Sequence, residues 1–376
     1  MRILFSGPGA AGHVFPMVPT AQALLSAGHD VLFAGSAPME LLRNTGLPAV
    51  DVGDGSTVLD AFRTSAAGAG YRSEGRSEEE MLRVAAAGFA QHSRSTLARL
   101  AELASAWLPD VIVHGAYQGA APLVARTLKI PAVVHNFGVV SGLRIADRLV
   151  TELAAEYREH GLDAAAPAER TVLDVVPESL GGDGVGWRVR YIPYNGGGVI
   201  PAELFAPRER LRVAVTLGTV LTAYDGVRSI RRVVDEAASV DAEFLLAVGG
   251  SDLEPLGALP GNVRPLPWVP LAGLLAASDA IVHHGGSGTM MSAVVAGVPQ
   301  LILPQGADHF GNAAAAEARG FALRAADEAV DGALLERLLH DDALRRAAVS
   351  TRDEVAALTS PAGLVRGFEE LLAAAR

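Results

Sequence analysis

Residues 2–34 of the chain read RILFSGPGAAGHVFPMVPTAQALLSAGHDVLFA. The apolar opening Arg2 to Phe5 predicts a strand, a glycine-rich loop follows it, and the pattern from Pro16 to Ala27 predicts a helix. A Gly28-His29-Asp30 turn then leads to a second apolar run, Val31 to Ala34. This is a βαβ unit. A chain that repeats it is expected to form a parallel sheet with helices on both faces.

The same rhythm continues through the rest of the chain and predicts an α/β fold. Two Rossmann-like, doubly wound domains facing each other across a cleft are expected, with ligands beyond the carboxyl ends of the strands. Further strands are expected at Val111–Val113, Ala132–Val134, Arg212–Leu217, Glu243–Val248, Ala280–His283 and Gln300–Leu303. Further helices are expected at Val227–Ser239, Leu271–Ala277, Gly288–Ala296, Asn312–Arg319 and Pro361–Arg376.

Length and composition favour two domains. The chain has 376 residues, and domains usually contain about 100–200. A stretch rich in glycine and proline, Pro193 to Arg210, predicts a linker, so we expect a domain over 1–195, a linker over 196–210 and a domain over 211–358. The terminal helix, 359–376, is expected to pack back toward the first domain. The polar stretch from Gly53 to Glu80 predicts a long loop near the cleft.

Charge and residue usage exclude several classes of protein. Half of the residues are hydrophobic, 19% are charged and the net charge is −11, with no basic cluster that would suit a nucleic acid. There is no cysteine, so disulfides and thiolate metal sites are excluded and a cytoplasmic location is the simpler expectation. No pattern of histidines or carboxylates predicts a metal site. The apolar runs are too short or too rich in glycine and proline for stable membrane insertion.

The segment AIVHHGGSGT, residues 280–289, predicts a phosphate-binding turn between a buried strand and a helix. Glycines let the backbone approach a ligand closely, and the free N–H groups at a helix start favour an anion. His284, Ser287 and Thr289 would add side-chain donors. The alternative is a tight strand–helix turn with a histidine satisfied in the core.

Two further segments make the sequence recognisable. GVPQLILPQGADH, residues 297–309, together with the 280–289 segment resembles the donor signature of nucleotide-sugar glycosyltransferases of the GT-B fold. RYIPYNG, residues 190–196, preceded by PESL at 177–180, looks like the actinobacterial enzymes that glycosylate macrolides, aromatic polyketides and other natural products. The resemblance implies that 1–195 binds an acceptor and 211–358 binds a nucleotide sugar.

The resemblance implies a role for each matching donor-site position. The diphosphate would be held by His284, Gly286, Ser287, Gly288 and Thr289, with Gly218 and Thr219 approaching from the loop after the first strand of the second domain. Trp268 and Val269 would hold the base, with a core position as the alternative for Trp268. Asp308 would bond sugar hydroxyls together with His309, which stands where many relatives have glutamine.

His13 is the candidate general base. It lies in a glycine-lined loop after the first strand, and its ordinary pKa of ~6.5 suits proton transfer near neutral pH. The Gly-His-x-x-Pro pattern of Gly12 to Pro16 resembles the family's catalytic loop; a structural histidine is the alternative. In many relatives an aspartate orients this histidine, but Gly115 occupies that position here. Another residue orients His13, or the base is less activated, or the acceptor is itself acidic, as phenols and enols are.

The resulting hypothesis is an inverting, metal-independent glycosyltransferase with no cofactor. It would move a deoxysugar from a dTDP-sugar, with UDP-sugar as a close competitor, to a hydrophobic acceptor lined by His114, Tyr117 and Phe137. One alternative is a UDP-sugar-dependent glycosyltransferase of glycolipids or the cell wall. Another is a catalytically inactive nucleotide-sugar-binding partner. A homodimer and an auxiliary activator protein remain open as partners.

Overall fold

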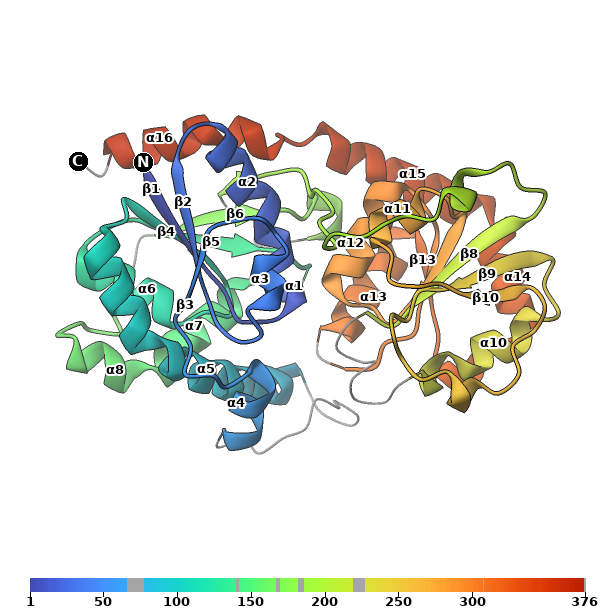
Figure 1. The fold of residues 1–376 in the computed structure, drawn as a ribbon, viewed down its shortest axis with the longest axis horizontal. Coiled ribbons are helices and arrows are strands. Elements are labelled where there is room, and N and C mark those ends of the chain that lie inside the picture. The colour runs from blue at the N-terminus through green and yellow to red at the C-terminus, as the bar shows by residue number, and fades with distance from the viewer. Residues whose placement is uncertain are drawn as a thin grey trace. The chain divides into compact units, whose positions relative to one another are not determined.

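The computed structural model describes residues 1–65, 78–139, 142–166, 170–181, 186–218, 227–306 and 308–374. These residues divide into two compact units. The first consists of Met1–Val176, Gly182–Arg190 and Leu358–Arg376, and the second of Pro177–Gly181 and Tyr191–Ala357. Each unit is an α/β layer structure with helices packed on its own sheet (Figure 1).

The first unit contains a seven-stranded parallel sheet within the described ranges, in the order β3-β2-β1-β4-β5-β6-β7. Figure 1 shows α5 and α6 on one side of this sheet and α2 on the other. The strands are β1 Arg2–Ser6, β2 Asp30–Gly35, β3 Ala49–Asp51, β4 Val111–Gly115, β5 Ala132–Asn136, β6 Thr171–Asp174 and β7 Trp187–Arg188. The helices are α1 Ala11–Val14, α2 Val18–Ser26, α3 Glu40–Arg43, α4 Val58–Thr64, α5 Glu78–Trp107, α6 Ala120–Leu128, α7 Gly142–Glu152, α8 Ala154–Glu159 and α16 Val365–Ala374, with 3-10 turns η1 Phe15–Met17 and η7 Pro361–Leu364.

The second unit contains a six-stranded parallel sheet among its described residues, in the order β10-β9-β8-β11-β12-β13. Its strands are β8 Leu211–Thr216, β9 Ala242–Leu246, β10 Val263–Pro265, β11 Ala280–His283, β12 Gln300–Ile302 and β13 Ala322–Arg324. Its helices are α10 Arg231–Ala237, α11 Leu271–Leu275, α12 Ser287–Ala296, α13 His309–Arg319, α14 Gly332–His340 and α15 Asp342–Ala357. Its 3-10 turns are η2 Glu178–Leu180, η3 Ala202–Phe205, η4 Arg228–Ile230, η5 Glu254–Leu256 and η6 Asp327–Ala329.

Both sheets share one topology, which fixes where a ligand can bind. Counted from its own first strand, each begins 3-2-1-4-5-6, the doubly wound order, and this confirms the predicted fold class. The direction of winding reverses between β1 and β4 in the first sheet and between β8 and β11 in the second. Loops that leave the carboxyl ends of these strands diverge to opposite faces, so a crevice opens beside them.

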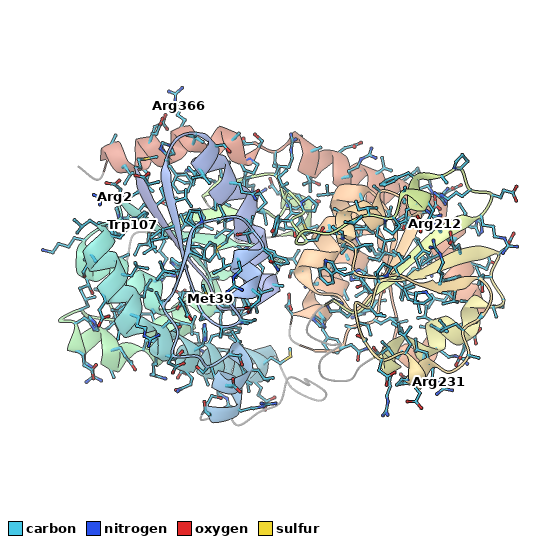
Figure 2. All side chains as sticks on the ribbon, viewed as in Figure 1. Arg2, Met39, Trp107, Arg212, Arg231 and Arg366 are labelled. Carbon is cyan, nitrogen blue, oxygen red and sulfur yellow. The ribbon has the colours of Figure 1, made fainter. Side chains whose placement is uncertain are left out.

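The sheets are held by apolar faces and by a few buried polar anchors. In the first unit Leu4 and Ile112 pack with Leu100 of α5 and Val124 of α6. At the last residue of α5, the Arg2 guanidinium donates to the Trp107 carbonyl at 2.6 Å, and Figure 2 shows the two residues side by side.

In the second unit the buried Arg212 is an internal anchor (Figure 2). Its guanidinium pairs with Glu243 of β9 at 2.8 Å. It also donates to the carbonyls of Leu204 and Ala277, at 2.9 and 3.2 Å. One buried cation therefore connects β8 to its neighbouring strand and to η3.

Three local expectations need correction. The helix predicted from Pro16 is preceded by the separate turn α1, so His13 lies in a helical turn. Within the expected loop from Gly53, α4 forms because Thr57 and Asp60 make a capping box, with the Thr57 hydroxyl accepting from the Asp60 N–H at 3.2 Å. Residues 66–77 of that stretch lie outside the described ranges. The α13 helix begins at His309, because the Asn312 N–H already reaches the Asp308 carbonyl at 2.9 Å.

The predicted linker is part of the second unit. Residues 196–210 follow Tyr191, where that unit resumes, and Leu204 is buried in its core. The Arg212 contact with the Leu204 carbonyl explains why this segment folds onto the sheet. The chain crosses between units after Val176, Gly181, Arg190 and Ala357.

Candidate functional site

One candidate site lies in the first unit, beside the reversal point of its sheet. His13 follows β1 in the turn α1, and Gly115 ends the neighbouring strand β4. The His13 side chain is partly buried. A histidine at the carboxyl end of a first strand is in the position where doubly wound folds bind ligands.

Aromatic rings surround His13. Its imidazole centroid lies 4.9 Å from Tyr117, 5.1 Å from Phe89 and 5.3 Å from Phe137. Phe89 also contacts Tyr117, at 4.8 Å, and Phe62 of α4, at 5.2 Å. The structure therefore brings together His13 and two of the predicted acceptor residues, Tyr117 and Phe137. It adds Phe62 and Phe89, which no motif in the sequence indicated.

The third predicted acceptor residue, His114, is inside the protein. It is only 1% exposed, and its Nδ1 donates to the Gly115 carbonyl at 3.0 Å. Burial lowers the pKa of His114 to about 4, so the ring is neutral at neutral pH. Because His114 lies on β4 under the covering helices, an acceptor would reach it only after local movement.

Gly115 occupies an open position. A Cβ built on Gly115 would meet only the Met17 Cε within 4 Å, at 4.0 Å. Neighbouring atoms therefore do not exclude a Cβ at Gly115, the position where the resemblance implies an aspartate.

Another candidate site lies in the second unit, beside the reversal point of its sheet, where two glycines enclose His284. A Cβ on Gly218, after β8, would lie 2.6 Å from the His284 Cε1, and a Cβ on Gly286 would lie 2.5 Å from its Nε2. Such distances are too short for carbon atoms, so both positions require glycine while the ring stays in place. Gly218 also has φ +67°, a conformation that favours glycine. Thr219 lies outside the described residues.

Thr216 shapes the loop that carries Gly218. Its hydroxyl donates to the carbonyl of Ala247, the residue after β9, at 2.9 Å and accepts from the Gly218 N–H at 3.2 Å. The turn is thereby fixed beside the N-terminus of α12, which presents free backbone N–H groups at Gly286, Ser287 and Gly288. Thr289 follows in the first turn of the same helix.

The two adjacent histidines have different environments. His283, at the end of β11, accepts from the Gly285 N–H through Nδ1 at 3.1 Å and donates through Nε2 to Gln300 at 2.9 Å. It is a structural residue, and burial lowers its pKa to about 4. Burial also lowers the pKa of His284 well below its usual value, and His309 and His283 add to this effect. A neutral His284 has a single N–H, for which the Thr216 backbone carbonyl and a bound phosphate oxygen would compete.

Asp308 is held against the start of α12. Its carboxylate accepts from the Ser287 hydroxyl at 2.6 Å and from the Asn312 amide at 2.8 Å. Asn312 also contacts the Ser287 hydroxyl at 3.0 Å and the Gly285 carbonyl at 2.8 Å. The sequence reading missed Asn312, although its spacing of four residues after Asp308 would place both on one helix face.

His309 points into the second unit. It is 2% exposed, and its ring lies 4.8 Å from that of His284 in an edge-to-face arrangement. Burial lowers the pKa of His309, while Asp308 acts in the opposite direction. The side chain thus contacts the candidate phosphate-binding histidine, and its predicted contact with a sugar stays a prediction.

The candidate base-binding residues lie after β10. Trp268 is 49% exposed, and its indole N–H donates to the Gly197 carbonyl at 3.1 Å, so the core alternative for this residue is wrong. An exposed ring face is available for stacking. Val269 is buried in the core and can contribute its backbone to a ligand.

The RYIPYNG segment supports the donor-site helix. The Tyr191 hydroxyl donates to the Gly288 carbonyl at 3.4 Å, and Asn195 bonds Ser292 at 3.3 Å and the Ala272 N–H at 2.9 Å. Burial raises the pKa of Tyr191 to about 12. The segment therefore ties α12 to α11 and fixes the helix whose N-terminus forms the candidate phosphate site.

Two structural features are absent from the described residues. No group of three or more His, Cys, Asp or Glu side chains among them is arranged to hold a metal ion. No helix in the same ranges has both the length and the apolar character needed to cross a bilayer.

Comparison with known proteins agrees with this geometry. The model of the erythromycin biosynthesis protein CIII-like N-terminal domain matches residues 22–218, and that of the C-terminal domain matches residues 231–371. Elloramycin glycosyltransferase ElmGT of Streptomyces olivaceus is 38% identical over 367 residues, 96% of this chain and 95% of that protein.

Solved structures show the same fold. Glycosyltransferase SnogD of Streptomyces nogalater has a TM-score of 0.85 at 34% identity, over 99% of both chains. Glycosyltransferase SsfS6 of Streptomyces sp. SF2575, solved with thymidine diphosphate, has a TM-score of 0.85 at 29% identity, over 98% of this chain and 99% of that one. Two doubly wound units of this kind define a GT-B glycosyltransferase. The chain belongs to the erythromycin biosynthesis protein CIII-like family of natural-product glycosyltransferases.

Proposed function

We propose that this glycosyltransferase moves a deoxysugar from a dTDP-sugar to a hydroxyl of a hydrophobic polyketide aglycone, with inversion at the anomeric carbon and without a metal ion. The observation that carries the proposal is the His284 ring enclosed between Gly218 and Gly286 at the start of α12. The thymidine diphosphate complex of SsfS6 and the elloramycin glycosyltransferase activity of ElmGT support the donor and the acceptor class.

The donor would bind to the second unit. Neutral His284 and the N–H groups of Gly286, Ser287 and Gly288 would donate to the diphosphate, with Thr289, Gly218 and Thr219 nearby. The Trp268 face and the Val269 backbone would hold thymine, and Asp308, supported by Ser287 and Asn312, would accept from sugar hydroxyls together with His309. These donors are present before the reaction and would stabilise the charge that grows on the leaving diphosphate.

The acceptor would bind to the first unit, where His13 lies among Phe89, Tyr117 and Phe137, with His114 behind them. His13 would take the proton of the acceptor hydroxyl while the oxygen attacks the anomeric carbon. The bond from that carbon to the phosphate oxygen breaks, and its electron pair leaves with dTDP. Alignment of the two substrates supplies a large part of the rate enhancement.

Domain roles follow from this assignment. Residues 1–190 would bind the acceptor and 191–357 would bind the nucleotide sugar, with the segment 196–210, predicted as a linker, belonging to the second unit and 358–376 to the first. A cytoplasmic location, a homodimer and an auxiliary activator protein stay predictions.

Thermal unfolding with dTDP, UDP, ADP or NAD tests the donor assignment. A ligand that binds only the folded state stabilises it by RT ln(1 + [L]/Kd), about 2.7 kcal/mol at 100 times Kd. We expect the largest rise of Tm with dTDP, a smaller rise with UDP, and loss of both in His284→Ala. Preference for UDP would favour the glycolipid or cell-wall alternative, and no rise with either diphosphate would contradict the proposal.

Two further measurements test the stereochemistry and the metal requirement. NMR of the glycoside should show the anomeric configuration opposite to that of the donor, and retention would contradict the direct displacement. Turnover should persist in excess chelator, since neutral imidazole and backbone N–H groups would hold the diphosphate. Loss of turnover that Mg²⁺ restores would contradict metal independence.

A further inference from the structure

The environment of His13 raises the question of what orients it. Gly115 supplies no carboxylate, although the backbone has room for one. Three aromatic side chains from three parts of the first unit contact the His13 ring: Phe89 of α5, Tyr117 after β4 and Phe137 after β5.

The geometry of these contacts is restrictive. Phe89 and Phe137 make edge-to-face contacts with the imidazole, with interplanar angles of 76° and 79°, and Tyr117 is inclined at 57°. Three ring centroids within 5.3 Å of the imidazole centroid leave little room for the imidazole to rotate. Edge-to-face aromatic pairs at 4.5–7 Å are also attractive.

The three rings are themselves held in place. Tyr117 contacts both Phe89, at 4.8 Å, and Phe137, at 5.9 Å. Phe89 belongs to a buried cluster with Leu123 and Leu149, and its other side meets Phe62. The rings thus form one connected set that is anchored in the core, so the position of His13 is determined by packing.

We propose that Phe89, Tyr117 and Phe137, here called the aromatic clamp, are the positioning residues of His13. They fix the plane of its ring and stabilise the imidazolium that forms when it accepts the proton. The second effect requires the imidazole edge to point at the ring faces, because the quadrupole of an aromatic ring attracts a cation that lies over its face within about 6 Å of the centroid. The inference rests on the proposed function of His13 as base, and it assigns to aromatic rings the role that an aspartate performs in many relatives.

Substitution of each ring by leucine tests the clamp. Phe89→Leu, Tyr117→Leu and Phe137→Leu keep an apolar side chain but remove the π-face. We expect kcat to fall about 2- to 30-fold, the equivalent of the ~0.5–2 kcal/mol that a cation–π contact contributes. Affinity for dTDP should stay unchanged, because the substituted residues lie in the other unit from His284.

The titration of His13 gives a readout that does not need an acceptor. In NMR spectra, the His13 ring signal is the one that disappears in His13→Ala. In each clamp variant its titration midpoint should fall, because the imidazolium loses stabilisation, and the acid limb of the kcat/KM profile should move the same way. Tyr117→Phe keeps the ring and should restore both properties; of the three clamp residues only Tyr117 can itself titrate.

Phe33→Leu is the matched control. Phe33 is fully buried in the same unit, where it lies on β2 and stacks on Phe5 of β1 at 5.9 Å. The Phe33→Leu variant should lower Tm as a clamp variant does and leave the titration midpoint of His13 unchanged. If clamp variants also lower Tm alone and leave the midpoint and the pH profile as in wild type, the inference is wrong. If His13→Ala retains turnover, the proposed function itself fails.

Discussion

The two candidate histidines lie beside the reversal points of two sheets of the same topology, His13 after the first strand of its sheet and His284 after the fourth strand of the other, and they have opposite surroundings. His13 follows β1 among aromatic rings, whereas His284 follows β11 between two glycines and beside two other histidines. A shared fold therefore supplies only the location, and the loop residues decide the chemistry. Rings favour a histidine that gains and loses a proton next to an apolar acceptor. Burial and neighbouring imidazoles favour a histidine that stays neutral and donates to phosphate.

The largest expected effect separates the two histidines directly. His13→Ala removes the proposed base, and general base catalysis typically contributes about 10²- to 10⁴-fold to a rate, so kcat should fall within that range. Binding of dTDP, measured by calorimetry, should not change, because the donor groups lie in the second unit. His29→Ala is the control, since His29 lies in the turn before β2 and pairs with the exposed Glu369 at 4.0 Å. Equal losses in both variants would break the comparison.

The glycine enclosure of His284 predicts an intermediate effect. Gly218→Ala places a Cβ 2.6 Å from the ring and a side chain at φ +67°, and such strain costs about 1–3 kcal/mol. The Kd for dTDP should therefore rise about tenfold in a calorimetric titration. Gly250→Ala is the matched control in the same unit, because its Cβ would meet nothing within 4 Å. Unchanged dTDP binding in Gly218→Ala would show that the ring is not held where the donor binds.

The smallest expected effect concerns His309. His309→Gln removes the ring that contacts His284 edge to face. It also removes the electrostatic effect of His309 that lowers the pKa of His284, so this pKa should rise toward its ordinary value. A larger cationic fraction then forms as the pH falls below 7. Relative to wild type, we expect dTDP affinity to be reduced about two- to fivefold at pH 7.5, since an aromatic pair contributes about 0.5–1 kcal/mol, and the difference to shrink toward pH 5.5. A constant ratio across this range would show that His309 does not influence the charge of His284.

Local patterns predicted most of the fold. Strand runs such as Ala280–His283 are continuous and apolar, so their position and the doubly wound order follow from period and rhythm. The strands β3, β6, β7, β10 and β13 escaped prediction because each has only two to four residues, too few for a periodic pattern. The capping box at Thr57 was readable in the sequence and was missed.

The candidate site was predictable only where its residues are close in sequence. The stretch from His283 to Thr289 identified the phosphate turn. It could not show that His283 bonds Gln300 while His284 meets Gly218, since that depends on contacts across the sheet. The aromatic clamp assembles from segments far apart in the chain, and Phe89 lies in a long helix where an aromatic residue is ordinarily read as core.

The discontinuity of the first unit has a consequence for how the protein is made. That unit needs residues 358–376, where Leu364 and Phe368 are buried and Phe368 packs on Trp187 at 5.1 Å. At about 5–20 residues per second, the ribosome needs roughly 10–40 s to proceed from Val176 to Leu358. During this time the first sheet is exposed to the cell without its last helix, and the second unit becomes complete only with Ala357, directly before the segment that contains this helix. The part of the enzyme that is synthesised first is therefore the part that finishes folding last, and its uncovered face is where chaperones are expected to bind during translation.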